Sequence, residues 1–375
     1  MGKTSAIAAA SALFLGATVA AAVPAAANAT ATATAQPAIT ASPVVNGSLS
    51  AVSASSSRDA WAVGTQTSAT APNLAEHWNG ATWTRVPVPT LRGQYFGLGS
   101  IADISPADAW ATGRSYDLAQ LVHWNGKAWS RVPIPSIGAH GLGAIGAASA
   151  SDIWAVGSGA SLHWNGKTWA RVPVPVSGLH DLNSVKVLSP SNAWAVGSVT
   201  VASSFGDITA NLILHWNGKT WTRIPSPAPL DAKYGDFLNG ITAVSAGNIW
   251  AVGCTDGCLV QGAFNPQIEH WNGKTWKQVA APATPYGIYT LNSVAAASVG
   301  DAWAVGGGGP GTALSGAIAH WNGGTWKLSH GLRGTQLYGV TALSTGDAWA
   351  VGVAQSGATG RALILHWNGK SWARS

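Results

Sequence analysis

The heptapeptide HWNGxxW recurs seven times along the chain, and this repetition constrains the fold more than any other feature. Three copies read HWNGKTW without a change, at 163–169, 215–221 and 270–276. The other four begin at residues 77, 123, 320 and 366. Such regularity indicates one structural unit repeated seven times, in which each copy covers a neighbour that could not bury its apolar face alone.

The repeat is longer than the heptapeptide, as the tryptophans show. Each unit has one Trp in a segment of the DAWAVG type and two in the heptapeptide, and these account for all 21 Trp in the chain. The DAWAVG-type Trp of successive units are 40 to 56 residues apart. This period is typical of the blades of a propeller.

Each unit divides into four short strands, which we call a, b, c and d. In residues 291–328 they are LNSVAAAS, DAWAVG, AIAHWNG and TWKL. The alternation of Trp and Val with Ala fits a strand, and Asn-Gly after strand c predicts a tight hairpin turn. Charged residues make up only 9% of the chain, and no helical periodicity runs for any length. The sequence therefore predicts an all-β domain.

The units resemble kelch repeats. The apolar pair and Gly of strand b, the aromatic residue ending strand c, and the Trp of strand d with its following Pro stand in kelch order. The chain departs from the pattern by having one Gly where kelch repeats have two, except at Gly306-Gly307, and Trp instead of Tyr in strand c. The resemblance implies a seven-bladed β-propeller of four-stranded antiparallel blades over 48–375, with strand a lining the channel. It leaves the function open, because kelch-like propellers include enzymes, adaptors and carbohydrate binders.

The first 47 residues are predicted to lie outside the propeller. Residues 1–29 have the pattern of a secretory signal peptide, with Lys3, an apolar run over 6–22 and a small-residue cleavage site at Ala27-Asn28-Ala29. A membrane anchor is the alternative, but the run is short and ends at Pro24 without a basic flank. Residues 30–47 are rich in Ala, Thr and Pro and are predicted to form a linker. We expect a secreted protein without a transmembrane segment.

Residues that repeat in all seven units are predicted to be structural. The HWNG histidines are expected to be hydrogen-bonded framework groups, because buried polar atoms need partners. The residue before strand b is Asp in five units and Asn in two, which indicates a shared hydrogen-bonding oxygen instead of a required charge. The repeated heptapeptide is therefore interpreted as framework.

Function is predicted to lie where the units differ. The lengths of the b–c and d–a connections vary, whereas the a–b and c–d connections are uniform. In an antiparallel four-stranded blade the two variable connections lie on one face, and variable loops on a rigid framework usually carry binding residues. The Tyr and mature Phe residues fall in these connections or near the start of strand a. The predicted ligand-binding residues are Tyr95, Phe96, Tyr116, His140, His180, Tyr234, Phe237, Tyr286, Tyr289 and Tyr338.

Other charged and reactive residues give weaker signals. Ten Lys and Arg residues occupy two repeated positions in the c–d turn and strand d, which favours solvation of edge strands over an anionic cell-wall partner. Cys254 and Cys258 are predicted to form a local disulfide, with metal binding as the alternative. Asp103 and Lys186 are the charged residues of the strand-a segments, and a salt bridge in the channel is the simplest interpretation of them.

Enzymatic activity has little support in the sequence. The Cys pair does not reproduce the Tyr–Cys pattern of kelch-like copper oxidases, and no G-x-S-x-G, HExxH or paired-carboxylate motif occurs. We expect no cofactor, no catalytic residue, no metal and no nucleic-acid partner. The predicted function is that of a monomeric, non-enzymatic binding module for extracellular glycan or cell-envelope polysaccharide. A protein-interaction scaffold is the second hypothesis, and a polysaccharide-active enzyme is the third.

The sequence also predicts how the ring closes. Strand a of the first unit begins near Leu49 and strand d of the last unit ends at Ser375, so each blade is continuous in sequence. The last d strand lacks the VPxP tail of most earlier units. We therefore expect blade 1 to pack on blade 7, with part of 30–47 covering the short last strand.

Overall fold

The structure is a computed structural model, and it describes eleven segments of the chain. These are residues 45–67, 72–90, 97–115, 118–137, 141–203, 206–227, 235–255, 265–283, 290–308, 315–356 and 359–375. The chain divides into two compact units, Met1–Pro37 and Ala38–Ser375, and every described residue belongs to the second unit. No helix that could cross a bilayer occurs in these segments.

The described residues form 28 strands, four in each sequence repeat. The a strands are β1 (Gly47–Ser56), β5 (Leu98–Ser105), β9 (Leu142–Ser149), β13 (His180–Ser189), β17 (Phe237–Ser245), β21 (Thr290–Ser298) and β25 (Thr335–Ser344). The b strands are β2 (Asp59–Gln66), β6 (Asp108–Ser115), β10 (Asp152–Gly157), β14 (Asn192–Ser203), β18 (Asn248–Thr255), β22 (Asp301–Gly308) and β26 (Asp347–Ser356). The c strands are β3 (Asn73–Trp78), β7 (Leu118–Trp124), β11 (Ala160–Trp164), β15 (Gly206–Trp216), β19 (Asn265–Trp271), β23 (Ser315–Trp321) and β27 (Thr359–Trp367). The d strands are β4 (Trp83–Arg85), β8 (Trp129–Arg131), β12 (Trp169–Arg171), β16 (Trp221–Ile224), β20 (Trp276–Val279), β24 (Trp326–Arg333) and β28 (Trp372–Arg374).

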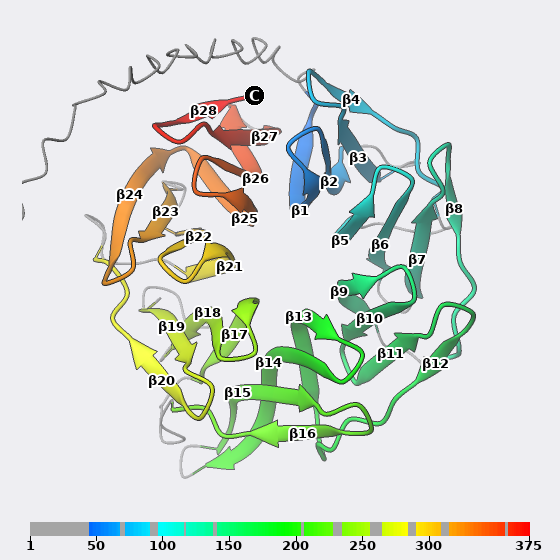
Figure 1. Cartoon of the computed structure of the whole chain (residues 1–375), viewed down its shortest axis with the longest axis vertical. Coiled ribbons are helices and arrows are strands. Elements are labelled where there is room, and N and C mark those ends of the chain that lie inside the picture. The colour runs from blue at the N-terminus through cyan, green and yellow to red at the C-terminus, as the bar shows by residue number, and fades with distance from the viewer. Residues whose placement is uncertain are drawn as a thin grey trace, which may run out of the picture. The chain divides into compact units, whose positions relative to one another are not determined.

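Each repeat forms one sheet in which strands a, b, c and d are hydrogen-bonded in sequence order. Neighbouring strands within each sheet are antiparallel, for example β1 with β2 and β2 with β3. Figure 1 shows the seven sheets arranged as blades around an axis, with the a strands innermost and the d strands at the rim. We number the blades 1 to 7 in chain order. The prediction of a seven-bladed propeller with four-stranded antiparallel blades and strand a lining the channel is confirmed.

The Asn-Gly pair forms the c–d turn in every blade. The seven turn glycines have φ between 85° and 93°, in the left-handed region that Gly adopts at little cost. The preceding Asn accepts two backbone N–H groups, as Asn79 Oδ1 does from Ala81 and Thr82 at 3.0 Å each. Because this pair of hydrogen bonds recurs in all blades, the c–d turns share one conformation.

Tryptophans form the core between blades. Trp61 of β2 lies 5.0 Å from both Trp124 and Trp129 of the next blade, in edge-to-face geometry with Trp129. The same set of one b-strand Trp against two Trp of the following blade recurs around the ring. Edge-to-face pairs add to the burial of apolar area, which is large for Trp. The three Trp of each repeat thus explain why stacked blades are stable.

The ring closes through the same contact. Trp349 of blade 7 lies 5.1 Å from Trp78 and 5.1 Å from Trp83 of blade 1. Every blade is continuous in sequence, and blade 7 has its own outer strand, β28. The expectation that blade 1 packs on blade 7 without a shared blade is confirmed.

Two residues before β1 extend the outer edge of blade 7. The last backbone N–H of the chain, at Ser375, donates to Ile364 O at 3.1 Å, and the next bond along β27 runs from Ala362 N to Val45 O at 2.9 Å. Asn46 forms an antiparallel bridge with Arg361, and its carbonyl accepts Thr67 N of blade 1 at 2.9 Å. Val45 and Asn46 therefore continue the line of the short β28 and tie blade 7 to blade 1.

Candidate functional site

The repeated His and Asp residues are structural, as predicted. In six blades the HWNG histidine Nε2 lies 2.5 to 3.1 Å from the Asp or Asn oxygen before strand b. The imidazole also packs against the b-strand Trp of its own blade, with centroids 4.0 to 4.4 Å apart. In blade 5 the hydrogen bond is missing, and both His270 Nε2 and Asn248 Oδ1 are buried without a hydrogen-bond partner. Burial lowers the pKa of His270.

Most predicted ligand-binding residues lie outside the described segments. These are Tyr95, Phe96, Tyr116, His140, Tyr234, Tyr286 and Tyr289. Of the other three, Phe237 and His180 are half-buried at the first residues of β17 and β13, and neither lines the channel. His180 Nδ1 lies 3.1 Å from Gly178 O. Tyr338 does line the channel, from the fourth residue of β25, so it belongs to the channel wall and not to a loop tip.

Cys254 is disulfide-bonded and fully buried at the end of β18. The chain has one other cysteine, Cys258, which lies outside the described segments. Within the described segments no group of three or more His, Cys, Asp or Glu residues could hold a metal ion. The pairing of Cys254 with Cys258 remains a prediction.

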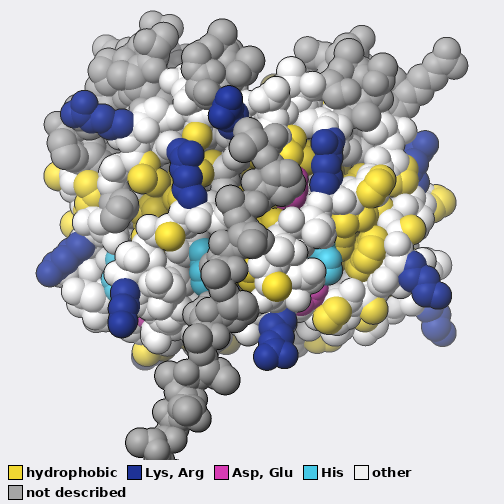
Figure 2. Space-filling model, turned by 90° about the horizontal axis from the view of Figure 1, so that it is seen from above, with side chains coloured by type: hydrophobic (Ala, Val, Ile, Leu, Met, Phe, Trp, Pro, Cys, Tyr) yellow, Lys and Arg dark blue, Asp and Glu magenta, His cyan; other side chains and the backbone are white. Residues whose placement is uncertain are grey.

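The ten repeated Lys and Arg residues are all exposed at the rim. Figure 2 shows Lys and Arg side chains spread over the side of the propeller without gathering into one patch. The ion pairs within the described segments are His–Asp contacts, none of which involves the rim cations. This arrangement is what solvation of short outer strands requires. It marks no single site.

The channel is a cavity whose lining residues differ in type from blade to blade. It has a volume of about 700 Å³ and is lined by strand a of all seven blades. In each a strand the pairing with strand b slips by one residue after a Leu, which produces a β-bulge. The bulged residues all line the channel, and they are Ser50, Gly99, Gly143, Asn183, Asn239, Asn292 and Tyr338.

The bulges lie where strand a leaves the d–a connection, so the bulged residues form the mouth of the channel on the variable face. Blades 4, 5 and 6 carry Asn there and blade 7 carries Tyr, whereas blades 1 to 3 carry Ser or Gly. The mouth therefore has one polar arc with long side chains and one arc with small residues. We call residues 183, 239, 292 and 338 the polar arc. The framework repeats in all seven blades, but the residues at the channel mouth differ between blades.

The three Asn side chains of the polar arc are held by the following blade. Nδ2 donates to Leu238 O from Asn183 at 2.9 Å, to Leu291 O from Asn239 at 3.0 Å, and to Leu337 O from Asn292 at 2.7 Å. Asn239 Nδ2 also donates to Thr290 Oγ1 at 3.5 Å, whereas Asn183 and Asn292 each use one of their two amide hydrogens in these bonds. The three amide oxygens accept nothing from the described residues. Fixed side chains with spare donors and acceptors at a cavity mouth are suited to recognising polar groups of a ligand.

Deeper in the channel, Lys186 and Asp103 are the charged side chains among the described lining residues. They do not form the salt bridge that the sequence suggested. Asp103 Oδ2 accepts Ser55 N of blade 1 at 2.9 Å, beside Asp59, which is bound to His77 at 2.7 Å. Burial and the negative charge of Asp59 raise the pKa of Asp103 to about 8, so it is mostly protonated at pH 7.

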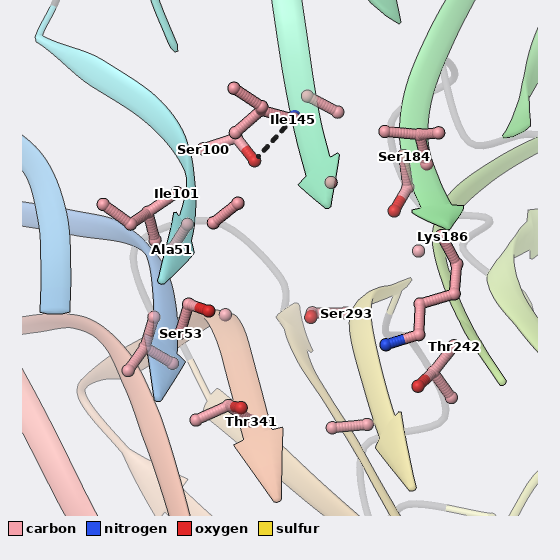
Figure 3. Close-up of a pocket in the computed structure, with 18 of the residues that line it drawn as sticks. Ala51, Ser53, Ser100, Ile101, Ile145, Ser184, Lys186, Thr242, Ser293 and Thr341 are labelled. Carbon is pink, nitrogen blue, oxygen red and sulfur yellow. Dashed lines mark hydrogen bonds between the residues drawn. The ribbon is translucent and has the colours of Figure 1, made fainter. Parts of the chain in front are cut away.

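Lys186 points into the channel from β13 (Figure 3). Its side chain is half-buried, and it has no ion pair or hydrogen bond with a described residue. Burial lowers the pKa of its ammonium group, because the charged form loses solvation. Thr242 and Ser293 line the same channel, and Figure 3 shows their hydroxyl groups there. The channel interior is thus polar, with one cation.

A second buried acid lies between blades 4 and 5. Glu269 of β19 is fully buried, and its Oε1 accepts Asn211 Nδ2 at 3.0 Å, Ser226 Oγ at 2.7 Å and Gln267 Nε2 at 2.7 Å. Burial outweighs these bonds and raises the pKa of Glu269 to about 7. The cluster does not line the channel, and its hydrogen bonds join blades 4 and 5, so we treat it as part of the blade interface.

Comparisons with known proteins identify the fold alone. No family model and no curated protein matches the chain. Among solved structures, YCF48 from Cyanidioschyzon merolae superposes with a TM-score of 0.57 at 17% identity, covering 88% of this chain and 100% of that one. A structure of YCF48 bound to D1 peptide gives 0.56 at 16% identity, with 88% and 96% covered. Virginiamycin B lyase from Staphylococcus aureus gives 0.53 at 12% identity, with 85% and 97% covered.

The chain has a β-propeller fold. Propellers with different activities occur among these similar structures, and identities this low carry no information on function. None of the three structures is described as a kelch protein, so the kelch resemblance remains a prediction from the sequence motifs.

Proposed function

We propose that this propeller is a non-enzymatic binding module that takes a segment of a partner protein at the mouth of its channel. The observation that carries the proposal is the polar arc. Four consecutive blades carry long hydrogen-bonding side chains at a position where the other three have the small residues Ser or Gly. Amide groups donate and accept at once, which matches the alternating N–H and C=O groups of a peptide backbone. The module is further proposed to be exported, on the basis of residues 1–29, and to be a monomer.

Peptide recognition also has a precedent in the same fold. YCF48, which superposes on this chain, has been observed with D1 peptide bound. A rigid ring with a polar cavity needs little rearrangement to bind an extended segment, so the ordering cost falls mainly on the ligand. This support is an analogy of fold and is independent of the polar arc.

Recognition of an extracellular glycan is the second candidate. It rests on the concentration of Tyr and Phe in the variable connections, since aromatic side chains supply contact area at low entropic cost. The described members of that set give it no added support, because Tyr338 and Phe237 are half-buried in strands.

Panning of a displayed random-peptide library against the purified mature chain, with a glycan array in parallel, tests the proposal. Selected peptides would be titrated against the wild-type chain, Tyr338→Phe and Asn292→Ala, with exposed Thr222→Ala on β16 as the matched control. Loss of one ligand hydrogen bond is expected to weaken binding by roughly 3- to 10-fold in the channel variants and to leave the control unchanged. Glycan binding with no selected peptide would overturn the proposal in favour of the second candidate.

A further inference from the structure

Lys186 occupies a channel position that is otherwise filled by small side chains. It pairs across the sheet with the b-strand tryptophan, Trp194. The residues that pair with the corresponding Trp in the other blades are Ser53, Ala102, Gly146, Thr242, Ala295 and Thr341. A long cationic side chain at one of seven equivalent positions is not needed for the ring, because six blades fold without it.

The position of Lys186 also carries a cost. A desolvated cation without a counter-ion destabilises a fold, and buried Lys is normally paired. Asp103 does not supply the negative charge, because it is bonded to the Ser55 backbone and is mostly protonated at pH 7. No other described residue lining the channel is acidic. The described channel wall therefore has a single basic side chain, Lys186, and its one acidic side chain, Asp103, is bonded elsewhere.

The hydroxyl groups of the channel wall present donors. Ser184 Oγ accepts Ile241 N at 3.3 Å, and Ser293 Oγ accepts Val340 N at 3.3 Å, each from the following blade. These bonds fix the two oxygens and leave each O–H hydrogen without a protein acceptor among the described residues. One basic side chain and O–H donors in the same channel together form an environment for an anion.

We propose that the channel is a binding site for a carboxylate, with Lys186 Nζ as its counter-ion and the channel hydroxyls as additional donors. A carboxylate group, with one negative charge and two acceptor oxygens, matches one cation and neutral donors. Phosphate-binding sites usually add Arg forks, backbone N–H nests or helix N-termini, and strand walls supply none of these here. The cavity of about 700 Å³ can take a side chain or a small acid.

The carboxylate has two possible sources, and one of them rests on the proposed function. It is either carried by the partner segment, as Asp, Glu or a C-terminus, or it belongs to a free small acid. Lys186 follows Asn183 of the polar arc along the same strand, β13, so a side chain that enters at the mouth extends toward it. The chemistry at Lys186 is the same in both cases.

The first arm of the test uses a small acid. Sodium glutarate and its neutral analogue glutaramide would be titrated at pH 7 and low salt into the wild-type chain, Lys186→Met, Lys186→Arg and the exposed control Lys219→Met. We expect glutarate alone to bind, Lys186→Met to weaken it by about 10- to 100-fold, and both Lys186→Arg and the control to retain it. Melting of each variant without ligand confirms that it is folded.

The second arm uses the selected peptides with each carboxylate replaced by its amide. The replacement is expected to weaken binding to the wild-type chain by about 10- to 100-fold and to have no effect on Lys186→Met, which places the two groups in one interaction. If glutarate does not bind and the amide replacement is equally costly in both proteins, the inference is wrong. Peptide binding that ignores Lys186 would leave the proposed function intact and overturn the inference alone. Glutarate binding with no peptide selected would leave the inference intact and overturn the proposed function.

Discussion

Trp349 of the last blade packs against Trp78 of the first with ring centroids 5.1 Å apart, the same relationship that Trp303 has with Trp367 at 4.9 Å within the continuous chain. The closing interface is therefore built like the six that are covalently continuous, and its residues are as deeply buried. A propeller closed in this way relies on repeated side chains instead of a blade shared between the two ends.

If the closing interface is equivalent to the other six, removal of its central tryptophan should cost as much stability as the same change elsewhere in the ring. Trp349→Ala and Trp303→Ala each delete a side chain that is 1% exposed, so each should lower the free energy of unfolding by roughly 3–5 kcal/mol through lost burial and a cavity. Urea denaturation followed by Trp fluorescence measures both. A much smaller loss for Trp349→Ala would show that the closing interface is weaker than the structure indicates.

The residues before β1 should contribute to closure through their backbone. A chain that begins at residue 48 lacks the bonds made by Val45 O and Asn46 O and should lose about 1–3 kcal/mol of stability relative to one that begins at residue 44. Asn46→Ala keeps both carbonyls and is the matched control, with an expected change near zero. Equal melting temperatures for the two chain lengths would contradict this role.

Blade 5 offers a repair that tests the framework role of the His–Asp pair. Asn248→Asp should give His270 the partner that five other blades have and stabilise the fold by about 1 kcal/mol. Asn192→Asp in blade 4 is the control, because His215 already bonds to Asn192 at 3.1 Å. NMR titration should show a raised pKa for His270 in the variant. A destabilised Asn248→Asp would mean that the blade has adapted to the amide.

The buried Glu269 predicts that stability falls as pH rises. Its folded-state pKa of about 7 lies above the unfolded value near 4.5, so the unfolded chain releases its proton first between these values. The stabilisation that comes from this pKa difference is complete below pH 4.5 and is lost by pH 7. Its loss lowers the free energy of unfolding by a total on the order of 3 kcal/mol over that range. Glu269→Gln should remove this part of the pH dependence and be more stable than the wild type at pH 8. Parallel stability–pH curves for the two proteins, measured by urea denaturation, would refute the assignment.

Much of the fold could be predicted from repeated residues. Trp61, His77 and Gly80 recur at fixed places in each unit, and each has a single structural task, so spacing alone was enough to identify blades and turns. The channel mouth was harder to predict. Asn183 follows a Leu inside a strand, and its orientation depends on a bulge between strands a and b that no local pattern marks directly.

The signal for the bulge lies in the neighbouring strand. A Cβ on Gly197 of strand b would lie 1.9 Å from Asp181 O, so the Gly after the Ala-Val pair is required where strand a slips. Aligning the seven units on that Gly and on the strand-a Leu would have grouped Asn183 with Tyr338. The charged residues Asp103 and Lys186 were identified as channel-facing from their strand alone. That they do not pair with each other was not predicted, because Asp103 bonds to the Ser55 backbone of a different blade.

The central claim is that ligand recognition belongs to the non-repeating channel residues and not to the repeated rim. The most direct measurement is the affinity of one selected peptide for two proteins, the Asn292→Ala/Lys186→Met double variant and a rim variant with Lys127, Lys167, Lys219, Lys274 and Lys370 changed to Gln. The account predicts at least about a tenfold loss for the channel variant and a change within about twofold for the rim variant. Normal binding by the channel variant together with loss of binding by the rim variant would contradict it.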